Sequence, residues 1–518
     1  MVSAPGKIFF LLHAHLPFVR EPDVPRFFEE NWLFEAISET YLPLVQMLRR
    51  TQEKGVPGTL NLSVSPPLIE MLSDDLLIQK FSKHLYKQLE LIEKEVKRFP
   101  DGQMNVLAAF YLERQKALID TWENRCQKNL LQEFSALEKA KKINILTCVG
   151  THPFLPAYES DLDAVERQLD YTVRTFKRAF HRDSVGVWLP ECGYFKGVEP
   201  LLKKYGFRYF FLETHGILLA NPTPEYGVFT SVKTPVGLFC MGRDQASSME
   251  VWSRRTGFPG HPEYREFFKD IAGERKRDYL TEYFYSGNTP IDTGLKYYRI
   301  TGKESKELYR PWNAMRLASE HAKIFIANRE ATFMDLLPKM NGNKAYILCP
   351  YDAELFGHWW FEGPLFLEAM MEFAASKSVL QLASADEILD FQTESVHEVA
   401  FSSWGEGGFS SVWINPETEK YYPMSYQIGQ KLKYLNSEKK TPLLKRVIRQ
   451  MERELLLFQA SDWAFMIHNH SAADYARKRL DTHYKNALQL FDLWSKKQKK
   501  ALLPLLESLE KKNNIFSE

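Results

Sequence analysis

The chain has 518 residues, with 67 Lys or Arg against 66 Asp or Glu, so its formal net charge at pH 7 is +1. A charge so close to zero gives no overall field that would attract nucleic acid or an anionic membrane, and we expect neither as a partner. With 44% hydrophobic and 26% charged residues the composition is typical of a globular protein, and the length predicts about three domains.

The first predicted element is a strand over residues 7–15, KIFFLLHAH. Its apolar run is short, is broken by two histidines and lacks a small-residue cleavage site, so we interpret it as a strand rather than a signal peptide. No segment reaches about 18 uninterrupted apolar residues, which argues against a transmembrane helix. The expected location is therefore the cytoplasm.

Five more strands are predicted, each a short apolar run. They cover residues 58–64, 143–152, 184–191, 207–214 and 344–354. Because these runs are continuously apolar rather than alternating, they are typical of parallel strands covered on both faces. Helical patterns lie between them, and this alternation predicts an α/β fold, either a barrel or a doubly wound sheet.

Two stretches interrupt the alternation of strand and helix. Residues 73–142 show only helical periodicity, and after about residue 416 no strand is predicted. We therefore expect an α/β domain formed by residues 1–72 and 143–415, an inserted helical domain at residues 73–142, and a C-terminal helical domain at residues 416–518.

Polar side chains stand where the predicted strands end, which is where an α/β barrel carries its active site. The first strand delivers His13 and His15, and later strands end at His152, at Glu191, at Glu213 with His215, and at Asp352 with Glu354. One such residue would be unremarkable as part of a core. Polar groups at the ends of five of the six predicted strands indicate a functional site.

Three kinds of chemistry could use these residues. His13 and His15, two positions apart, could bind zinc or another divalent ion together with His152 or an acid. Cys192 could be a nucleophile, but the adjacent carboxylate of Glu191 disfavours the thiolate that this requires. The five cysteines of the chain are scattered without a CxxC pair, so neither a disulfide framework nor a cysteine zinc site is expected.

The third possibility is a pair of carboxylates acting on a sugar. Glycosidases place two carboxyl groups on either side of the bond that they cleave, and Glu191 and Asp352 could be brought together by a barrel. Aromatic residues make up 14% of the chain, and flat rings are suited to stacking against sugars. A helix cap and a buried ion pair remain the alternative structural roles for the two acids.

Five motifs, in this order, resemble those of family 57 glycoside hydrolases. They are HAHLPFV (13–19), GTLNLSVSPPL (58–68), GVWLPECGY (186–194), YDAELFGHWWFEG (351–363) and SSWGEGG (402–408). The similarity covers essentially the whole chain. Within the family, QASDWAFMI (459–467) and GRDQASSMEVWS (242–253) are most similar to the 1,4-α-glucan branching enzymes.

The resemblance implies an incomplete (β/α)7 barrel with an inserted helical domain and a C-terminal helical domain that contributes to the substrate cleft. It implies a retaining mechanism on an α-1,4-glucan, with Glu191 as nucleophile and Asp352 as general acid/base, and neither metal nor cofactor. The substrate-binding residues that it implies are His13, His15 and His152 at the donor sugar and Arg265, Trp404, Trp413 and Asp462 along the glucan. Trp32 is a further stacking candidate, although packing within a helix would explain it equally well. For the oligomeric state, which the sequence does not determine, we expect a monomer.

The expected product is an α-1,6 branch, formed when a glucan 6-hydroxyl accepts the cleaved chain. The alternatives are an α-amylase or a 4-α-glucanotransferase of the same family, because water or a 4-hydroxyl could accept the chain instead. Residues 216–260, rich in Gly, Pro and aromatics with little periodicity, are predicted to form a loop that covers the glucan site. More distant hypotheses are a metal-dependent polysaccharide deacetylase, which chelators would inhibit, and a non-catalytic glucan-binding regulator.

Overall fold

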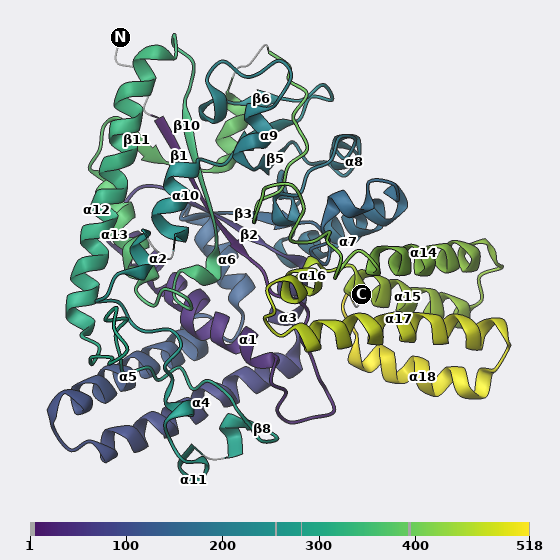
Figure 1. Ribbon diagram of the computed structural model, residues 1–518, viewed down its shortest axis with the longest axis horizontal. Helices are drawn as coiled ribbons and strands as arrows, with labels where there is room; N and C mark the ends of the chain where they lie inside the picture. Colours follow the sequence, from purple (N-terminus) through teal and green to yellow (C-terminus); the bar gives the residue numbers. More distant parts are fainter. Residues whose placement is uncertain (1–5, 254–255, 281, 392–394, 517–518) are drawn as a thin grey trace.

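The computed structural model describes residues 6–253, 256–280, 282–391 and 395–516 (Figure 1). All six predicted strands are confirmed, most of them shorter than expected. They are β1 (Gly6–Ala14), β2 (Leu60–Val64), β3 (Ile143–Cys148), β4 (Gly186–Trp188), β5 (Tyr209–Leu212) and β10 (Tyr346–Asp352). Nearly every residue in them is buried, as expected for strands covered on both faces.

The strands pair in parallel around a barrel. The order is β10-β1-β2-β3-β4-β5-β7, with β7 at Phe239–Gly242. The two ends of this order are joined at a single bridge, where the residue after β7, Arg243, pairs with Leu348 of β10. Among the described residues this gives seven parallel strands closed by one narrow contact, which confirms the predicted incomplete (β/α)7 barrel.

The prediction of an irregular loop over residues 216–260 was wrong for much of that segment. It holds β7, a short strand β6 (Val232–Lys233), and the helices α9 (Thr214–Leu218) and α10 (Gln245–Trp252). β7 is only four residues long, so its apolar pattern is too short to distinguish from a loop, and its pairing with β5 comes from the tertiary fold. The strand β11 (Leu380–Leu382), which pairs with β1, was missed for the same reason.

Helices surround the barrel (Figure 1), and most of them bury one face. They are α1 (Glu30–Glu35), α2 (Leu42–Glu53), α3 (Pro66–Leu72), α7 (Leu162–Phe180), α8 (Glu199–Lys204), α12 (Pro311–Leu336) and α13 (Gly363–Ala375). α7 shows the rule clearly, because its buried residues recur at three- and four-residue steps from Ala164 to Phe180.

Residues between β2 and β3 form the helices α4 (Asp75–Arg98), α5 (Gly102–Asp120) and α6 (Leu130–Lys139). The long segment between β7 and α12, which contains α11 (Arg277–Leu280), β8 (Tyr285–Ser286) and β9 (Thr289–Pro290), packs against α4 and α5 (Figure 1). Gln88 of α4 donates to the carbonyl of Thr293 over 2.9 Å, and Tyr111 of α5 donates to that of Lys296 over 2.6 Å.

The C-terminal part is helical. It contains α14 (Tyr421–Ser437), α15 (Pro442–Phe458), α16 (Ser461–His468), α17 (Ala473–Ser495) and α18 (Lys499–Lys512). α14, α15, α17 and α18 form a bundle beside the barrel, and the short α16 lies between the two (Figure 1). The amide of Ser461 donates to the carbonyl of His152 over 2.8 Å, which fixes α16 to the loop after β3. None of the described helices is long and apolar enough to cross a bilayer.

Candidate active site

A cavity of about 530 Å³ opens at the carboxyl ends of the barrel strands. Its lining consists of His13, His15, Leu16, His152, Glu191, Arg243, Trp252, Asp352, Glu354, Trp359, Trp404, Gly405, Trp413, Asp462 and Phe465. The strand register explains part of this set, since His13 of β1 lies directly beside Asp352 of β10. The cavity thus combines several carboxylates and histidines with a wall of aromatic rings, as expected for a site that binds a sugar chain.

A larger cavity, of about 840 Å³, lies on the outside of the barrel between α4, α6 and α7. None of the described residues that line it is Trp, Tyr or Phe, and its single acid is Asp75. It therefore has neither the paired carboxylates nor the stacking surfaces that the inner cavity offers.

Two of the ten predicted site residues do not line the inner cavity. Trp32 packs edge-on against Tyr475, with ring centres 5.6 Å apart, so its indole joins α1 to α17. Arg265 has a side chain only 1% exposed, 3.7 Å from the carboxylate of Glu39 and 3.9 Å above the ring of Phe361. Arg265 is therefore enclosed by protein and lies outside the lining of the cavity.

Glu191 follows β4 in a strained turn of the backbone. Its φ is +62° and that of Cys192 is +50°, a left-handed conformation that non-glycine residues adopt at a cost. The turn directs the carboxylate to two donors, since the indole N–H of Trp404 lies 2.6 Å from Oε2 and the hydroxyl of Ser461 lies 2.8 Å from Oε1. Each carboxylate oxygen is therefore held by one donor from a distant part of the chain.

Trp404 and Trp413 come from the SSWGEGG motif and the residues after it. Gly405, with a φ of +82°, allows this loop to turn, because a Cβ at that position would lie 3.0 Å from the ring of Trp413. Trp413 stacks on Phe154 with ring centres 4.7 Å apart. Its indole nitrogen is buried and has no hydrogen-bond partner among the described residues.

Burial makes the two predicted catalytic acids difficult to ionise. It raises the pKa of Glu191 to about 7, against the hydrogen bonds from Trp404 and Ser461 that lower it. It raises the pKa of Asp352 well above the usual value, and the negative charges of Glu354 and Glu191 raise it further. The surroundings of the two acids thus differ in the sense that a nucleophile and a general acid require, because two donors favour the ionised form of Glu191 and two neighbouring carboxylates disfavour that of Asp352.

This difference predicts a bell-shaped dependence of kcat/KM on pH. Activity should rise as the pH increases through about 7 and Glu191 ionises, and it should fall at higher pH as Asp352 loses its proton. Glu354 has a pKa raised to about 7 by burial as well, so a Glu354→Gln variant provides the control. Its acidic limb should stay in place while its alkaline limb moves to lower pH; an acidic limb that disappears would contradict the assignment to Glu191.

Three histidines line one side of the cavity. The ring of His15 stacks on that of His152 with centres 3.8 Å apart, and its Nε2 lies 3.1 Å from both carboxylate oxygens of Asp462. Burial opposes a charge on His15, yet the contacts with Asp462 and the charges of Glu191 and Glu354 together outweigh it and raise its pKa. His13 and His152 form no hydrogen bond to a carboxylate, and burial lowers the pKa of both well below the usual value.

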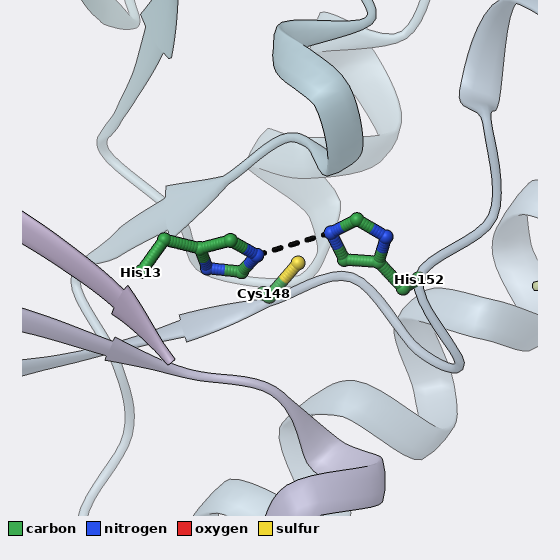
Figure 2. A group of neighbouring side chains, drawn as sticks. All are labelled: His13, Cys148 and His152. Carbon is green, nitrogen blue, oxygen red and sulfur yellow. Dashed lines mark hydrogen bonds between the residues drawn. The ribbon is translucent and has the colours of Figure 1, made fainter. Parts of the chain in front are cut away.

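Two groups of these residues bring potential metal ligands together in the described part of the chain. They are His13, Cys148 and His152, shown in Figure 2, and His15, His152 and Asp462. In the second group the stacked rings of His15 and His152 are nearly parallel, at 12°, so their nitrogen lone pairs do not converge on one point.

In the first group the nitrogens of His13 and His152 point at each other. The ring centres are 5.2 Å apart and the two Nε2 atoms are 3.0 Å apart. The difference between these two distances is about the width of one imidazole ring, as expected when each ring points its Nε2 straight at the other. The lone pairs therefore lie along one line, which suits a hydrogen bond rather than a shared metal ion. Burial raises the pKa of the Cys148 thiol well above its usual value, which disfavours the thiolate that a metal would need.

Cys192, considered above as a nucleophile, is buried and does not line the cavity. Burial raises the pKa of its thiol well above the usual value, and the charge of Glu213 raises it further. All five cysteines are free and buried. The thiol next to Glu191 is thus a packing residue, and the carboxylate is the group that faces the cavity.

Several residues of the cavity were not among the predicted site residues. They are Arg243, Trp252, Glu354, Trp359 and Phe465 at its lining and Ser461 behind it. Glu354, which accepts from Tyr41, could have been included because it follows a strand end two residues after Asp352. Trp359 lies within the YDAELFGHWWFEG motif, and Arg243 and Trp252 lie within GRDQASSMEVWS. The positions of the latter two depend on β7, a strand that the sequence pattern does not reveal.

Comparison with known proteins assigns the chain to a family. The sequence model described as glycosyl hydrolase family 57 matches residues 9–400, and that described as 1,4-alpha-glucan branching enzyme, C-terminal, matches residues 426–518. A 1,4-alpha-glucan branching enzyme of Thermococcus kodakarensis is 31% identical over 99% of this chain and 77% of its own.

Two solved structures have closely similar folds. An alpha-amylase of Thermotoga maritima superposes with a TM-score of 0.89 at 36% identity, covering 99% of this chain and 98% of its own. A GH57-type branching enzyme of Pyrococcus horikoshii superposes with a TM-score of 0.87 at 30% identity, covering 99% and 95%. The likeness extends through the C-terminal helices in both cases.

Proposed function

The chain belongs to glycosyl hydrolase family 57, and from this we propose that it is a 1,4-alpha-glucan branching enzyme. It cleaves an α-1,4 bond with retention and transfers the released chain to a 6-hydroxyl of a glucan. The observation that carries this proposal is the position of α16. This helix lies in the region that resembles the C-terminal part of branching enzymes, and it supplies Asp462 and Phe465 to the cavity that contains Glu191 and Asp352.

The first half of the reaction breaks the α-1,4 bond. The carboxylate of Glu191 attacks the anomeric carbon, while Asp352, held protonated by burial, gives its proton to the departing 4-oxygen. The products of this step are a glycosyl ester on Glu191 and a shortened glucan with a free 4-hydroxyl. His13, His15 and His152 bind the hydroxyls of the donor sugar, and Trp404, Trp413 and Asp462 contact the chain.

The second half forms the branch. The ionised Asp352 removes the proton from an acceptor 6-hydroxyl, whose oxygen attacks the anomeric carbon and releases Glu191 as a carboxylate. Water would give hydrolysis by the same route, so the outcome depends on how well the site excludes water and binds a second glucan. The aromatic rings at the cavity mouth, Trp252, Trp359 and Phe465, are 38%, 53% and 45% exposed and are available for that purpose.

A second candidate function is supported by one observation. The alpha-amylase of Thermotoga maritima is 36% identical to this chain, more than the 30% of the branching enzyme of Pyrococcus horikoshii. Hydrolysis of α-1,4 bonds is therefore the alternative that an experiment has to exclude.

Incubation of the purified protein with amylose separates the two. A branching enzyme produces α-1,6 linkages, measured by proton NMR and by the chains that a debranching enzyme releases, with few new reducing ends. An amylase produces reducing ends in proportion to the bonds cleaved and no α-1,6 signal. A new population of linear chains without branches would instead indicate 4-α-transfer.

Trp252 is proposed to favour transfer over hydrolysis. It ends α10, lies 6.4 Å from Trp404 between ring centres and is 38% exposed at the cavity mouth. Trp252→Ala should lower the ratio of branching to hydrolysis about three- to tenfold, the value of one aromatic contact to a sugar ring. Trp312→Ala, at a tryptophan that is 65% exposed and does not line the cavity, is the control and should leave the ratio unchanged. An unchanged ratio in the Trp252 variant would show that this ring does not bind the acceptor.

The remaining assignments are part of the same proposal. We propose a catalytic domain formed by residues 1–72 and 143–415, an inserted helical domain at residues 73–142 and a C-terminal domain at residues 416–518 that contributes to the cleft. We also propose a role in the synthesis of a glycogen-type glucan in the cytoplasm, by a monomer that uses no metal or cofactor.

A further inference from the structure

Ser461, the first residue of α16, lies between the carboxylate of Glu191 and the imidazole of His152. Its Oγ is 2.8 Å from Oε1 of Glu191 and 2.8 Å from Nδ1 of His152, and the residue is buried. A hydroxyl has one proton, so it can donate to only one of these two neighbours and must accept from the other.

The contacts continue from His152 into the barrel. Nε2 of His152 lies 3.0 Å from Nε2 of His13 (Figure 2), and Nδ1 of His13 lies 3.2 Å from Oγ of Ser63 on β2. Both imidazoles are buried and neither forms a hydrogen bond to a carboxylate, since the nearest approach is the 3.7 Å between His152 and Glu191. Burial therefore keeps both rings neutral, with one N–H each. Five side chains, Ser63, His13, His152, Ser461 and Glu191, therefore form one row of hydrogen bonds.

With neutral rings, this row has two consistent arrangements of its protons. In the first, every donor points toward Glu191: Ser63 donates to His13, His13 to His152, His152 to Ser461 and Ser461 to Glu191. In the second, every donor points away, and the row then needs a protonated Glu191 at its end. If Glu191 were ionised while Ser461 donated to His152, the oxygens of Ser461 and Glu191 would lie 2.8 Å apart with no proton between them. Two lone pairs would then face each other, which is repulsive.

We propose that Ser461 is a positioning residue for the nucleophile and that the neutral pair His152 and His13 directs its hydroxyl proton onto Glu191. This inference rests on the proposed role of Glu191 and names a residue that the role requires. Ser461 and Trp404 then hold the two carboxylate oxygens from opposite sides. The C-terminal helices thereby help to position the nucleophile.

The other charged groups around Glu191 do not replace this donor. His15 and Asp462 face it as an ion pair, Nδ1 of His152 lies 3.7 Å from Oε1, and Asp352 adds a further carboxyl group across the cavity. Glu354 and Arg243 line the same cavity. Loss of the Ser461 hydroxyl would leave Oε1 without its donor, and the ionised form of Glu191 would be less favoured.

Ser461→Ala tests the inference. It should lower kcat about ten- to a hundredfold with little change in KM, because one hydrogen bond to a charged group is lost. The acidic limb of its pH profile should move to higher pH, and Ser461→Thr, which keeps a hydroxyl, should recover part of the rate. Ser425→Ala is the matched control, since it removes a buried serine hydroxyl from α14 that contacts Gln459 over 3.0 Å; it should change neither quantity. A change in KM alone, or an unmoved acidic limb, would contradict the proposal.

The rate is best measured as fluoride release from α-maltosyl fluoride, which reports on the attack by Glu191 whatever the acceptor. A protein that releases fluoride but forms no branches would refute the proposed function and leave the inference about Ser461 standing. Neutron diffraction from the wild-type protein, at a pH above the acidic limb, requires no variant. It should show deuterium on Nδ1 of His152 and on Nε2 of His13, and deuterium on Nε2 of His152 instead would overturn the proposed direction.

Discussion

Glu191→Gln should lower the rate of glucan cleavage by about 10⁴-fold or more, the largest effect that we expect of any substitution in the chain. An amide has the shape of the carboxylate but cannot form the glycosyl ester, so the lower-barrier route through that ester is lost. Only substrate binding and the general acid then contribute to the rate. The measurement is the initial rate with amylose, alongside thermal unfolding to confirm that the variant is folded.

The smaller variant Glu191→Ala distinguishes a nucleophile from a group that only supports the site. It leaves room for azide, which can attack α-maltosyl fluoride directly at the anomeric carbon. For a retaining enzyme that has lost its nucleophile, this single displacement gives a glycosyl azide of inverted configuration. An azide product with retained configuration, or full activity of Glu191→Gln, would contradict the role assigned to Glu191.

The second large effect is expected at Asp352. Asp352→Asn should lower the rate with amylose by about 10²- to 10⁴-fold, because the departing 4-oxygen no longer receives a proton. Release of fluoride from α-maltosyl fluoride should be reduced far less, since fluoride leaves without protonation. The comparison of the two substrates in one variant is therefore the measurement.

The companion variant Asp352→Ala provides the control for the acid/base role. Added azide should accelerate its turnover by attacking the glycosyl ester on Glu191, and the glycosyl azide should retain its configuration. Equal losses with amylose and with the fluoride, or an inverted azide product, would show that Asp352 is not the general acid.

Much of the fold could be predicted from the sequence, for a physical reason. Strands that are buried on both faces appear as uninterrupted apolar runs, and the polar residues that end them stand out. This is why His13, Glu191 and Asp352 could be proposed before their positions were known. The parallel arrangement then brings such ends to one mouth, as the pairing of His13 with Asp352 shows.

The residues that sequence patterns did not reveal depend on contacts between distant segments. β7 is four residues long and is defined by its pairing with β5, so Arg243 and Trp252 had no visible strand to locate them. Ser461 approaches Glu191 only because α16 docks on the loop after β3, across 270 positions of sequence. Arg265 was assigned to the glucan from the family resemblance, but its side chain is buried beside Glu39.

The proposed mechanism forms a covalent glycosyl-enzyme at Glu191, whose sugar passes to a glucan rather than to water. The most direct measurement incubates the protein with a 5-fluoro-glycosyl fluoride, which forms the ester quickly and releases it slowly, and locates the added mass by peptide mass spectrometry. We predict one glycosyl group on the peptide that contains Glu191, lost on addition of amylose with transfer of the fluorosugar to a glucan 6-hydroxyl. Continued turnover without any labelled peptide, or a label on another residue, would contradict this mechanism.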